Sequence, residues 1–219
     1  MKNRLINLCL LVCVGVLVSC GGGDSFDILS PSPFLHAQST YGSGKSGSYT
    51  PANFYSHYAI PGNTAYNPLG SGTSTFSLGG YGSVIAIVDA PGSPAATVIS
   101  DLIKFNQSFT PNLPALTSCT STTSGLGSGC NPSIPFITVI DYSGGVVNSG
   151  WQGEIALDTQ WAHAFAPRAS IVLVISKSAS GADLATAQAL AASLPNVVAV
   201  SMSYGGNEPS ASYDAFYDA

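Results

Sequence analysis

Four apolar runs, separated by stretches with helical spacing, set the pattern of residues 82–202. The runs are rich in aliphatic and β-branched side chains and do not alternate with polar residues, as expected of strands that are buried on both faces of a parallel sheet. Strands that alternate with helices predict an α/β fold with right-handed crossovers. The expected strands are 84–88, 136–140, 170–175 and 197–202, and the expected helices are 94–105, 151–166 and 182–194.

The helical stretch 151–166 carries two carboxylates on one face. Glu154 and Asp158 lie about 40° apart around the helix, and Trp161 and Phe165 fall within about 20° of Glu154. If that face is buried, the pair holds one proton between its oxygens and can act as a general base in mildly acidic conditions. If it is solvated, the helix touches the core only through its aromatic edge. The pattern leaves both interpretations open.

Polar residues follow the first and the last of the expected strands. Asp89 ends the first, and Ser203-Tyr204-Gly205 follows the last. Function gathers beyond the carboxyl ends of the strands in such sheets, so both segments are candidates, although Asp89 fits a strand-terminating turn equally well. His163 lies about 180° from Glu154 around the helix, which predicts a position at the surface or in a second layer.

The N-terminus has the pattern of a lipoprotein export signal. A basic start, Met1–Arg4, precedes an apolar run that ends in Leu17-Val18-Ser19-Cys20, which resembles a bacterial lipobox. We expect residues 1–19 to be a signal peptide and Cys20 to be acylated, so that the protein is exported and lipid-anchored to the bacterial cell envelope or extracellular. Residues 20–80, rich in Gly, Ser and Pro, are expected to form a tether and N-terminal wrap before a domain at 81–219.

The chain is acidic, with 6 Lys and Arg against 11 Asp and Glu and a formal net charge of −5. Loss of Lys2 and Arg4 with the signal would make the net charge −7. Nucleic acid is therefore not expected as a partner, because phosphate binding needs clustered Lys and Arg. Cys119 and Cys130 enclose a loop of small polar residues and are expected to form one disulfide in an oxidising compartment. Neither has the spacing of a metal ligand, and no metal site is expected.

Several motifs follow one another in a recognisable order: Tyr49-Thr50-Pro51, Ile85-Ala86-Ile87-Val88-Asp89, Glu154-(x)3-Asp158-(x)2-Trp161-Ala162-His163-Ala164 and Ser201-Met202-Ser203-Tyr204-Gly205-Gly206-(x)-Glu208. From about Tyr49 onward, this order resembles the sedolisin family of serine-carboxyl peptidases. The resemblance implies a subtilisin-like α/β fold in which a glutamate replaces the subtilisin histidine. It also implies endopeptidase activity on proteins and peptides at acid pH.

The resemblance implies a role for each matching residue. Glu154 corresponds to the general base that takes the proton of the nucleophilic serine, and Asp158 to the carboxylate that hydrogen-bonds and orients that glutamate. Asp89 stands where some members have an acidic residue that supports the triad. Ser203-Tyr204-Gly205 resembles the extended segment that pairs with the substrate backbone, with Tyr204 where the family usually has Trp.

Other family features do not occur in these 219 residues. The family's nucleophile lies in a Gly-Thr-Ser motif far downstream, its oxyanion aspartate soon after the point where this sequence stops, and its calcium site near the C-terminus; a large propeptide precedes the domain. The sequence Gly72-Thr73-Ser74 looks like such a motif, but it lies in a polar segment ahead of every expected core strand and is not taken as the nucleophile. We therefore expect the N-terminal part of a truncated peptidase domain, without a cofactor and inactive alone. The alternative is a non-catalytic surface lipoprotein that uses the same fold for binding.

Overall fold

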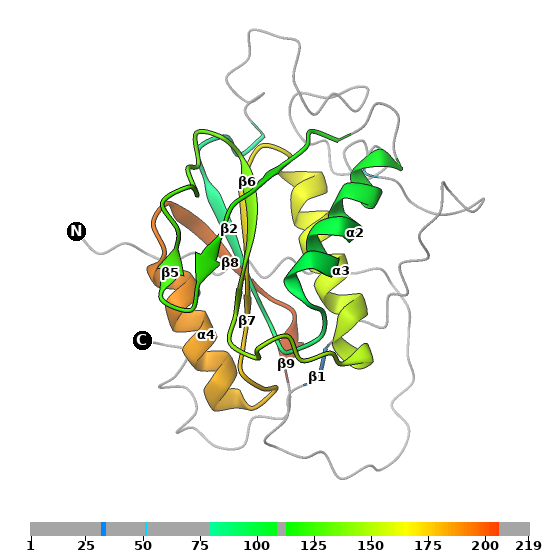
Figure 1. Cartoon of the computed structure of the whole chain (residues 1–219), viewed down its shortest axis with the longest axis vertical. Helices are drawn as coiled ribbons and strands as arrows, with labels where there is room; N and C mark the ends of the chain where they lie inside the picture. The colour runs from blue at the N-terminus through cyan, green and yellow to red at the C-terminus, as the bar shows by residue number, and fades with distance from the viewer. Residues whose placement is uncertain (1–31, 34–50, 52–78, 109–112, 206–219) are drawn as a thin grey trace, which may run out of the picture.

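The four apolar runs form the four long strands of one parallel sheet in the computed structural model, which describes residues 32–33, 51, 79–108 and 113–205 (Figure 1). The strand order is β3-β6-β7-β2-β8, and every neighbouring pair is parallel. The predicted α/β class is thus confirmed. The strands are β2 (Val84–Asp89), β3 (Thr117–Ser118), β6 (Phe136–Asp141), β7 (Ser170–Ile175) and β8 (Val197–Met202).

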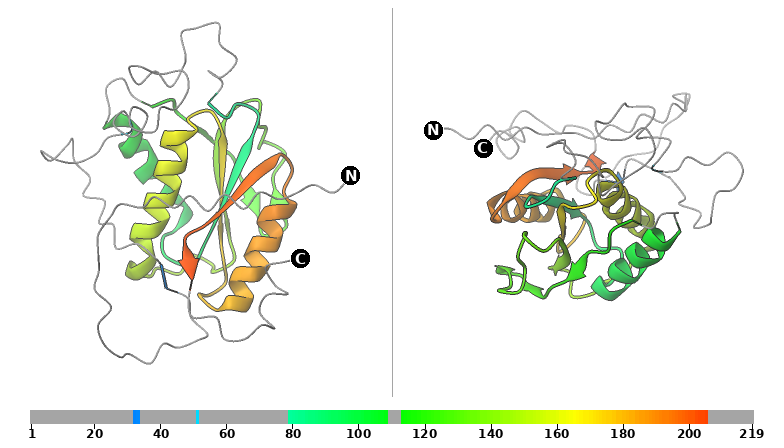
Figure 2. Two further views of the ribbon diagram at one scale, coloured as in Figure 1. Left: turned by 180° about the vertical axis from the view of Figure 1, so that it is seen from behind. Right: turned by 90° about the horizontal axis from the view of Figure 1, so that it is seen from above.

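Helices cover both faces of the sheet (Figure 2). α2 (Ala95–Gln107) and α3 (Ser149–Phe165) lie on one face, and α4 (Gly181–Ser193) lies on the other. Alternate residues of each strand therefore meet different helices: Val88 of β2 packs in the cluster with α4, and Ile87 in the cluster with α2 and α3. This two-sided burial explains why the strands read as continuous apolar runs.

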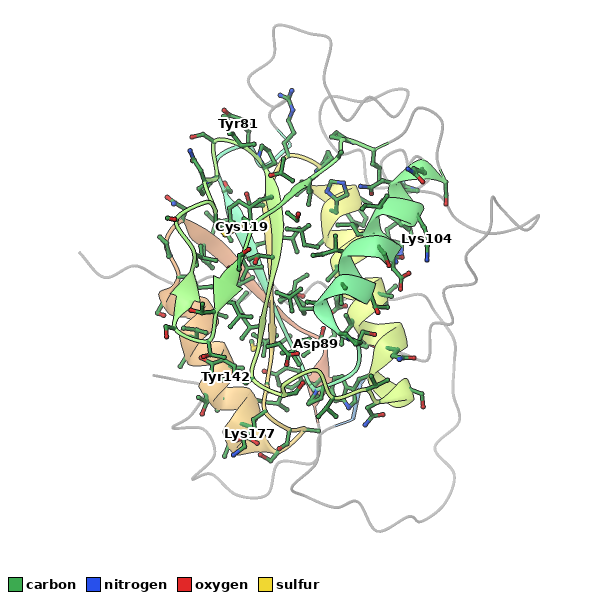
Figure 3. All side chains as sticks on the ribbon, viewed as in Figure 1. Tyr81, Asp89, Lys104, Cys119, Tyr142 and Lys177 are labelled. Atoms are coloured by element: carbon green, nitrogen blue, oxygen red, sulfur yellow. A yellow bond between two sulfur atoms is a disulfide. The ribbon has the colours of Figure 1, made fainter. Side chains whose placement is uncertain are left out.

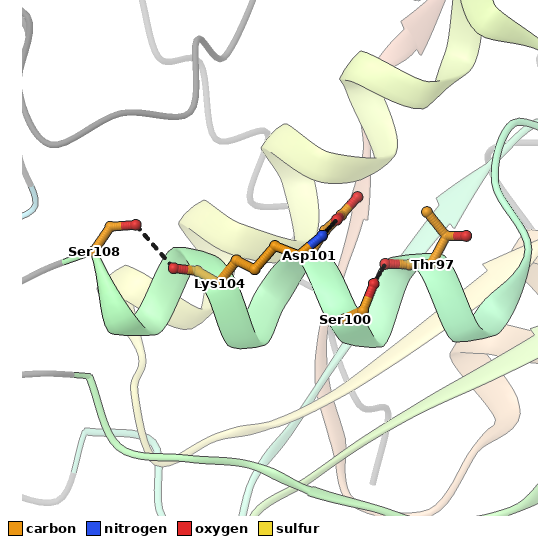
Figure 4. Close-up of polar contacts among 5 residues, drawn as sticks. All are labelled: Thr97, Ser100, Asp101, Lys104 and Ser108. Carbon is orange, nitrogen blue, oxygen red and sulfur yellow. Dashed lines mark hydrogen bonds and ion pairs between the residues drawn. The ribbon is translucent and has the colours of Figure 1, made fainter.

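The exposed side of α2 is polar and internally bonded (Figure 4). Lys104 Nζ lies 3.3 Å from Oδ1 of Asp101, and the Ser108 hydroxyl donates to the Lys104 carbonyl at 2.8 Å near the helix end. The opposite side buries Val98 and Leu102. The helix expected at 94–105 is thus present, and its apolar side lies against the sheet.

The connection that contains α3 has the opposite hand from the other two. From β2 to β6 the chain moves two places across the sheet through α2, and from β6 to β7 it moves one place back through α3 on the same face. Two crossovers that run in opposite directions over one face must differ in hand. The β7-to-β8 connection runs in the same direction as the second but over the other face, so it shares the hand of the first (Figure 2).

Right-handed crossovers are the rule in parallel sheets, so the unit β6–α3–β7 is the left-handed one. The prediction of right-handed crossovers is wrong for this unit. Because α3 stays on the face of α2, it lies beside the loop that leaves β2 rather than beside α4.

A disulfide-closed loop borders β6. Cys119 and Cys130 form a disulfide, and the loop between them contains a small hairpin of β4 (Ser121–Thr122) and β5 (Gly125–Leu126). The Tyr142 hydroxyl donates to the Thr123 carbonyl at 2.7 Å, which ties the hairpin to the segment after β6. These two-residue strands were not predicted.

The proposed signal peptide, the lipobox at Cys20, the tether and Ser74 lie outside the described residues, except that 32–33, 51 and 79–80 are described. Within the described part of the chain, no helix is both long enough and apolar enough to cross a membrane.

Candidate functional site

Asp89 lies at the carboxyl end of β2 (Figure 3), and the carboxylates of Glu154 and Asp158 are close enough to act on its charge. β2 and β8 are parallel neighbours in which Val88 is paired with Met202, so Asp89 and Ser203 emerge from the same edge of the sheet. Glu154 and Asp158 approach this edge from α3, and both influence the charge on Asp89. The topology therefore brings together side chains that are more than 100 residues apart in sequence, as the carboxyl edge of such a sheet commonly does.

The loop after β2 holds the first turn of α3. The Asn148 backbone N–H donates to the Gly92 carbonyl at 3.1 Å, and the Asn148 side chain caps the helix by accepting from the Gly150 N–H at 2.9 Å. A Cβ on Gly92 would lie 2.8 Å from Ile155 Cδ1 and 2.9 Å from the Trp151 carbonyl carbon. Glycine at this position therefore lets α3 pack directly on the loop three residues beyond Asp89.

Asp89 is a buried carboxyl and not a turn aspartate. Its side chain is 0% exposed, and neither carboxylate oxygen has a hydrogen-bond partner among the described residues. Asp141, which ends β6, provides the contrast: its two oxygens accept from Ser143 N, Ser143 Oγ and Gly145 N at 2.6 to 2.9 Å. The turn interpretation thus fits Asp141 and is excluded for Asp89.

Burial and two neighbouring carboxylates raise the pKa of Asp89 well above its ordinary value of 3.8. Burial has the largest effect, because it penalises the charged form, and the charges of Asp158 and Glu154 add to it. The ionisation of Asp89 therefore depends on whether Asp158 and Glu154 carry charge.

Glu154 is 2% exposed, and both of its carboxylate oxygens are shielded from solvent. The alternative of a solvated acidic helix face is therefore excluded. The two aromatic residues expected beside Glu154 lie further along α3: the ring of Trp161 packs against Phe165, with centroids 5.9 Å apart, and against Phe105 of α2 at 6.2 Å. They contribute to the packing between α2 and α3.

Asp158 accepts a hydrogen bond from Ser203. Ser203 Oγ lies 3.1 Å from Oδ1, and Oδ2 is buried without a hydrogen-bond partner among the described residues. Burial raises the pKa of Asp158 from 3.8 to about 6, and the bond from Ser203 opposes that rise. The sequence placed Ser203 with the substrate-pairing residues, whereas the structure directs its side chain to Asp158.

The backbone just after Ser203 pairs with an extended segment. β9 (Tyr204–Gly205) forms an antiparallel ladder with β1 (Ser32–Pro33), in which Ser32 is opposite Gly205 and Pro33 opposite Tyr204. The segment that resembles a substrate-pairing strand thus has an edge that accepts an antiparallel partner. In this structure the partner comes from the N-terminal part of the same chain.

His163 is buried, which excludes the surface as its place and leaves the second layer. Its side chain is 0% exposed, and Nε2 is 2.9 Å from the Pro114 carbonyl oxygen. The segment that leads into β3 covers the side of α3 that was expected to face outward. Burial lowers the pKa of His163 to about 4, so the ring is neutral above that pH and donates through Nε2–H.

The arrangement can hold and transfer protons in mildly acidic solution, since Asp158 titrates near pH 6 beside two further carboxyl groups. Within the described ranges, no group of three or more His, Cys, Asp or Glu side chains is placed to hold a metal ion. A scan against protein-family models and searches among curated proteins and solved structures find no match. Fold and site together define an α/β protein with a buried carboxylate cluster at the carboxyl edge of its parallel sheet.

Proposed function

We propose that this chain supplies the carboxylate part and the substrate-pairing strand of a sedolisin-like serine-carboxyl endopeptidase with a subtilisin-like fold. The observation that carries the proposal is the position of Glu154: it is buried on α3, next to the carboxyl edge of the sheet, where its charge and that of Asp158 both act on Asp89. A buried carboxylate kept among other carboxyl groups can take a proton from a serine hydroxyl in mildly acidic solution.

The β1–β9 ladder supports a peptide as the ligand class. Extended peptides bind by adding a strand to an exposed edge, where backbone hydrogen bonds provide affinity. An extended segment already lies antiparallel on Tyr204–Gly205, one residue after the group that binds Asp158. A substrate in the same place would have its backbone beside the carboxylates. The nucleophile would come from the downstream Gly-Thr-Ser motif that the resemblance implies.

The decisive experiment starts from the reading frame that follows codon 219, by expressing the longest chain that it encodes. We expect that chain to hydrolyse protein substrates at about pH 3 to 5, and Glu154→Gln to lower kcat/KM by about 10²- to 10⁴-fold. Asp101→Asn is the matched control, because Asp101 is an α2 carboxylate paired with the exposed Lys104, away from the cluster. Full activity of Glu154→Gln would contradict the assignment.

The 219-residue chain by itself is expected to show no turnover, because catalysis needs a nucleophile and oxyanion donors in place. Turnover by this chain that is abolished by Ser74→Ala would instead identify Ser74 as the nucleophile. The second candidate function is peptide binding without catalysis, as in a surface lipoprotein, and the β1–β9 pairing favours it because that pairing requires no chemistry. A stop codon after residue 219, with retained peptide binding, would support this second function.

A further inference from the structure

Ser203 is held between two pairing segments. Met202 before it pairs with Val88 of β2, and Tyr204 after it pairs with Pro33 of β1. With the backbone fixed on both sides, the direction of the Ser203 side chain is set by the fold. Its hydroxyl lies 3.1 Å from Oδ1 of Asp158, 45 residues earlier in the sequence.

The hydroxyl of Ser203 donates to a carboxylate that has no other hydrogen-bond donor among the described residues. Asp158 is partly buried, and its Oδ2 has no hydrogen-bond partner in the described part of the chain. The charges of Asp158 and Glu154 both act on Asp89. A donor that is bound to one oxygen stabilises charge there and leaves the other oxygen to hold a proton. The serine thus distinguishes two oxygens that are otherwise equivalent.

We propose that Ser203 is a positioning residue that fixes the orientation of Asp158 and reserves Oδ2 for the proton shared within the carboxylate cluster. The catalytic part of this inference rests on the proposed function, in which Asp158 orients the base Glu154. Ser203 is not placed as the nucleophile, since its hydroxyl donates to Asp158 rather than to the proposed base. In this proposal the substrate pairs with the backbone of the next two residues, Tyr204 and Gly205, which form β9.

The matched pair Ser203→Thr and Ser203→Val tests the hydroxyl alone, because the two side chains have the same shape and only threonine donates a hydrogen bond. Carboxyl-carbon NMR titration of Asp158 in the 219-residue chain is the readout. We expect the pKa of Asp158, about 6 in the native chain, to change little with threonine and to rise by about one pH unit with valine. An equal pKa in both variants would overturn the proposal.

Two further measurements distinguish a failure of this inference from a failure of the proposed function. Repeating the titration in Asp89→Asn chains removes one neighbouring charge, and the difference between the valine and threonine variants should persist there. In an active longer chain, valine should lower kcat by about tenfold or more with KM unchanged and move the acid limb of the pH profile upward. A rise in KM alone would assign Ser203 to substrate binding. A pKa change without any peptidase activity would support positioning and count against the proposed function.

Discussion

A methyl group added to Gly92 would lie 2.9 Å from the carbonyl carbon of Trp151, closer than side-chain atoms approach backbone in folded proteins. Gly92→Ala must therefore push the first turn of α3 away from the loop after β2. We expect a loss of about 1 to 3 kcal/mol in the free energy of unfolding. We also expect a lower pKa for Asp89, because Glu154 and Asp158 move away from it.

Gly129→Ala is the control for this change. Gly129 has no atom within 4 Å of an added Cβ, so the same substitution there should change stability by no more than about 0.5 kcal/mol. Denaturant unfolding of both variants checks the prediction. Equal unfolding midpoints for the two variants would show that α3 can move away from the loop after β2 without loss of stability.

Asp89→Asn should stabilise the chain at neutral pH. A carboxyl whose pKa is raised by folding contributes stability that is full below pH 3.8 and is lost as the pH rises through the folded value. The amide does not titrate, so the variant escapes that loss, and we expect a gain of about 1 kcal/mol or more at pH 7. Asp141→Asn should destabilise instead, because that carboxylate accepts three hydrogen bonds. Lower stability of Asp89→Asn at pH 7 would refute the electrostatic account.

His163 should destabilise the fold in acid. Its pKa is lowered from 6.5 to about 4, so its contribution is full above pH 6.5 and is lost as the pH falls through about 4, a change of about 3 kcal/mol. Asp158, with its pKa raised to about 6, acts with the opposite sign over the same range. His163→Gln keeps a donor for Pro114 but does not titrate. Unfolding measured from pH 4 to pH 7 should show a smaller loss toward acid in the variant; parallel curves would contradict this.

The disulfide between Cys119 and Cys130 should contribute about 2 to 3 kcal/mol, because it restricts the unfolded loop that contains β4 and β5. The double change Cys119→Ser with Cys130→Ser should lower the unfolding midpoint accordingly. The wild-type protein should be unfolded in denaturant without a reductant and then alkylated. Mass measurement should find neither Cys119 nor Cys130 modified. Two reactive thiols at these positions would show that the bond does not form in solution.

The β1–β9 ladder should protect the Gly205 amide from hydrogen exchange. In an antiparallel pair only alternate residues direct their N–H to the partner, and Pro33, opposite Tyr204, has no N–H, so the amide expected to face β1 is that of Gly205. Ser32→Pro removes the backbone donor opposite Gly205, so exchange at the Gly205 amide should become faster. The amides of β8, which pair with β2, are the internal reference and should not change. If a peptide pairs with β9, it must displace β1, so the same substitution should also strengthen peptide binding. Unchanged exchange at Gly205 would mean that the ladder contributes no protection.

The long strands could be predicted because each is an apolar run that is buried on both faces, a pattern that survives without any tertiary information. The two-residue strands could not, since two residues contain no periodicity, and β3 to β5 depend on a disulfide and on their neighbour β6. The reverse hand of the crossover through α3 also has no local signal. It depends on where α3 packs, and Gly92 permits that packing.

The candidate site, like the fold, could be predicted only in part from the sequence. Glu154, Asp158 and Asp89 could be selected from helix spacing and strand ends, but their burial could not be decided, because α3 buries polar residues such as Gln160 and His163 together with Ile155. Polar residues on a buried face conceal that face from a hydrophobicity pattern. The bond from Ser203 to Asp158 joins two elements that only the assembled sheet brings together.

The order of the strands also determines when the sheet can form. β2 is the first long strand of the described residues, yet its partners are β7 and β8, which begin 86 and 113 residues later. A growing chain therefore contains a central apolar strand with both edges open until residues 170–175 have been made, and with one edge open until 197–202 have followed. Such distant pairing slows folding and prolongs the exposure of strand edges that can associate with other chains. Early folding of this protein should therefore depend on factors that shield β2 more than on the stability of the finished sheet.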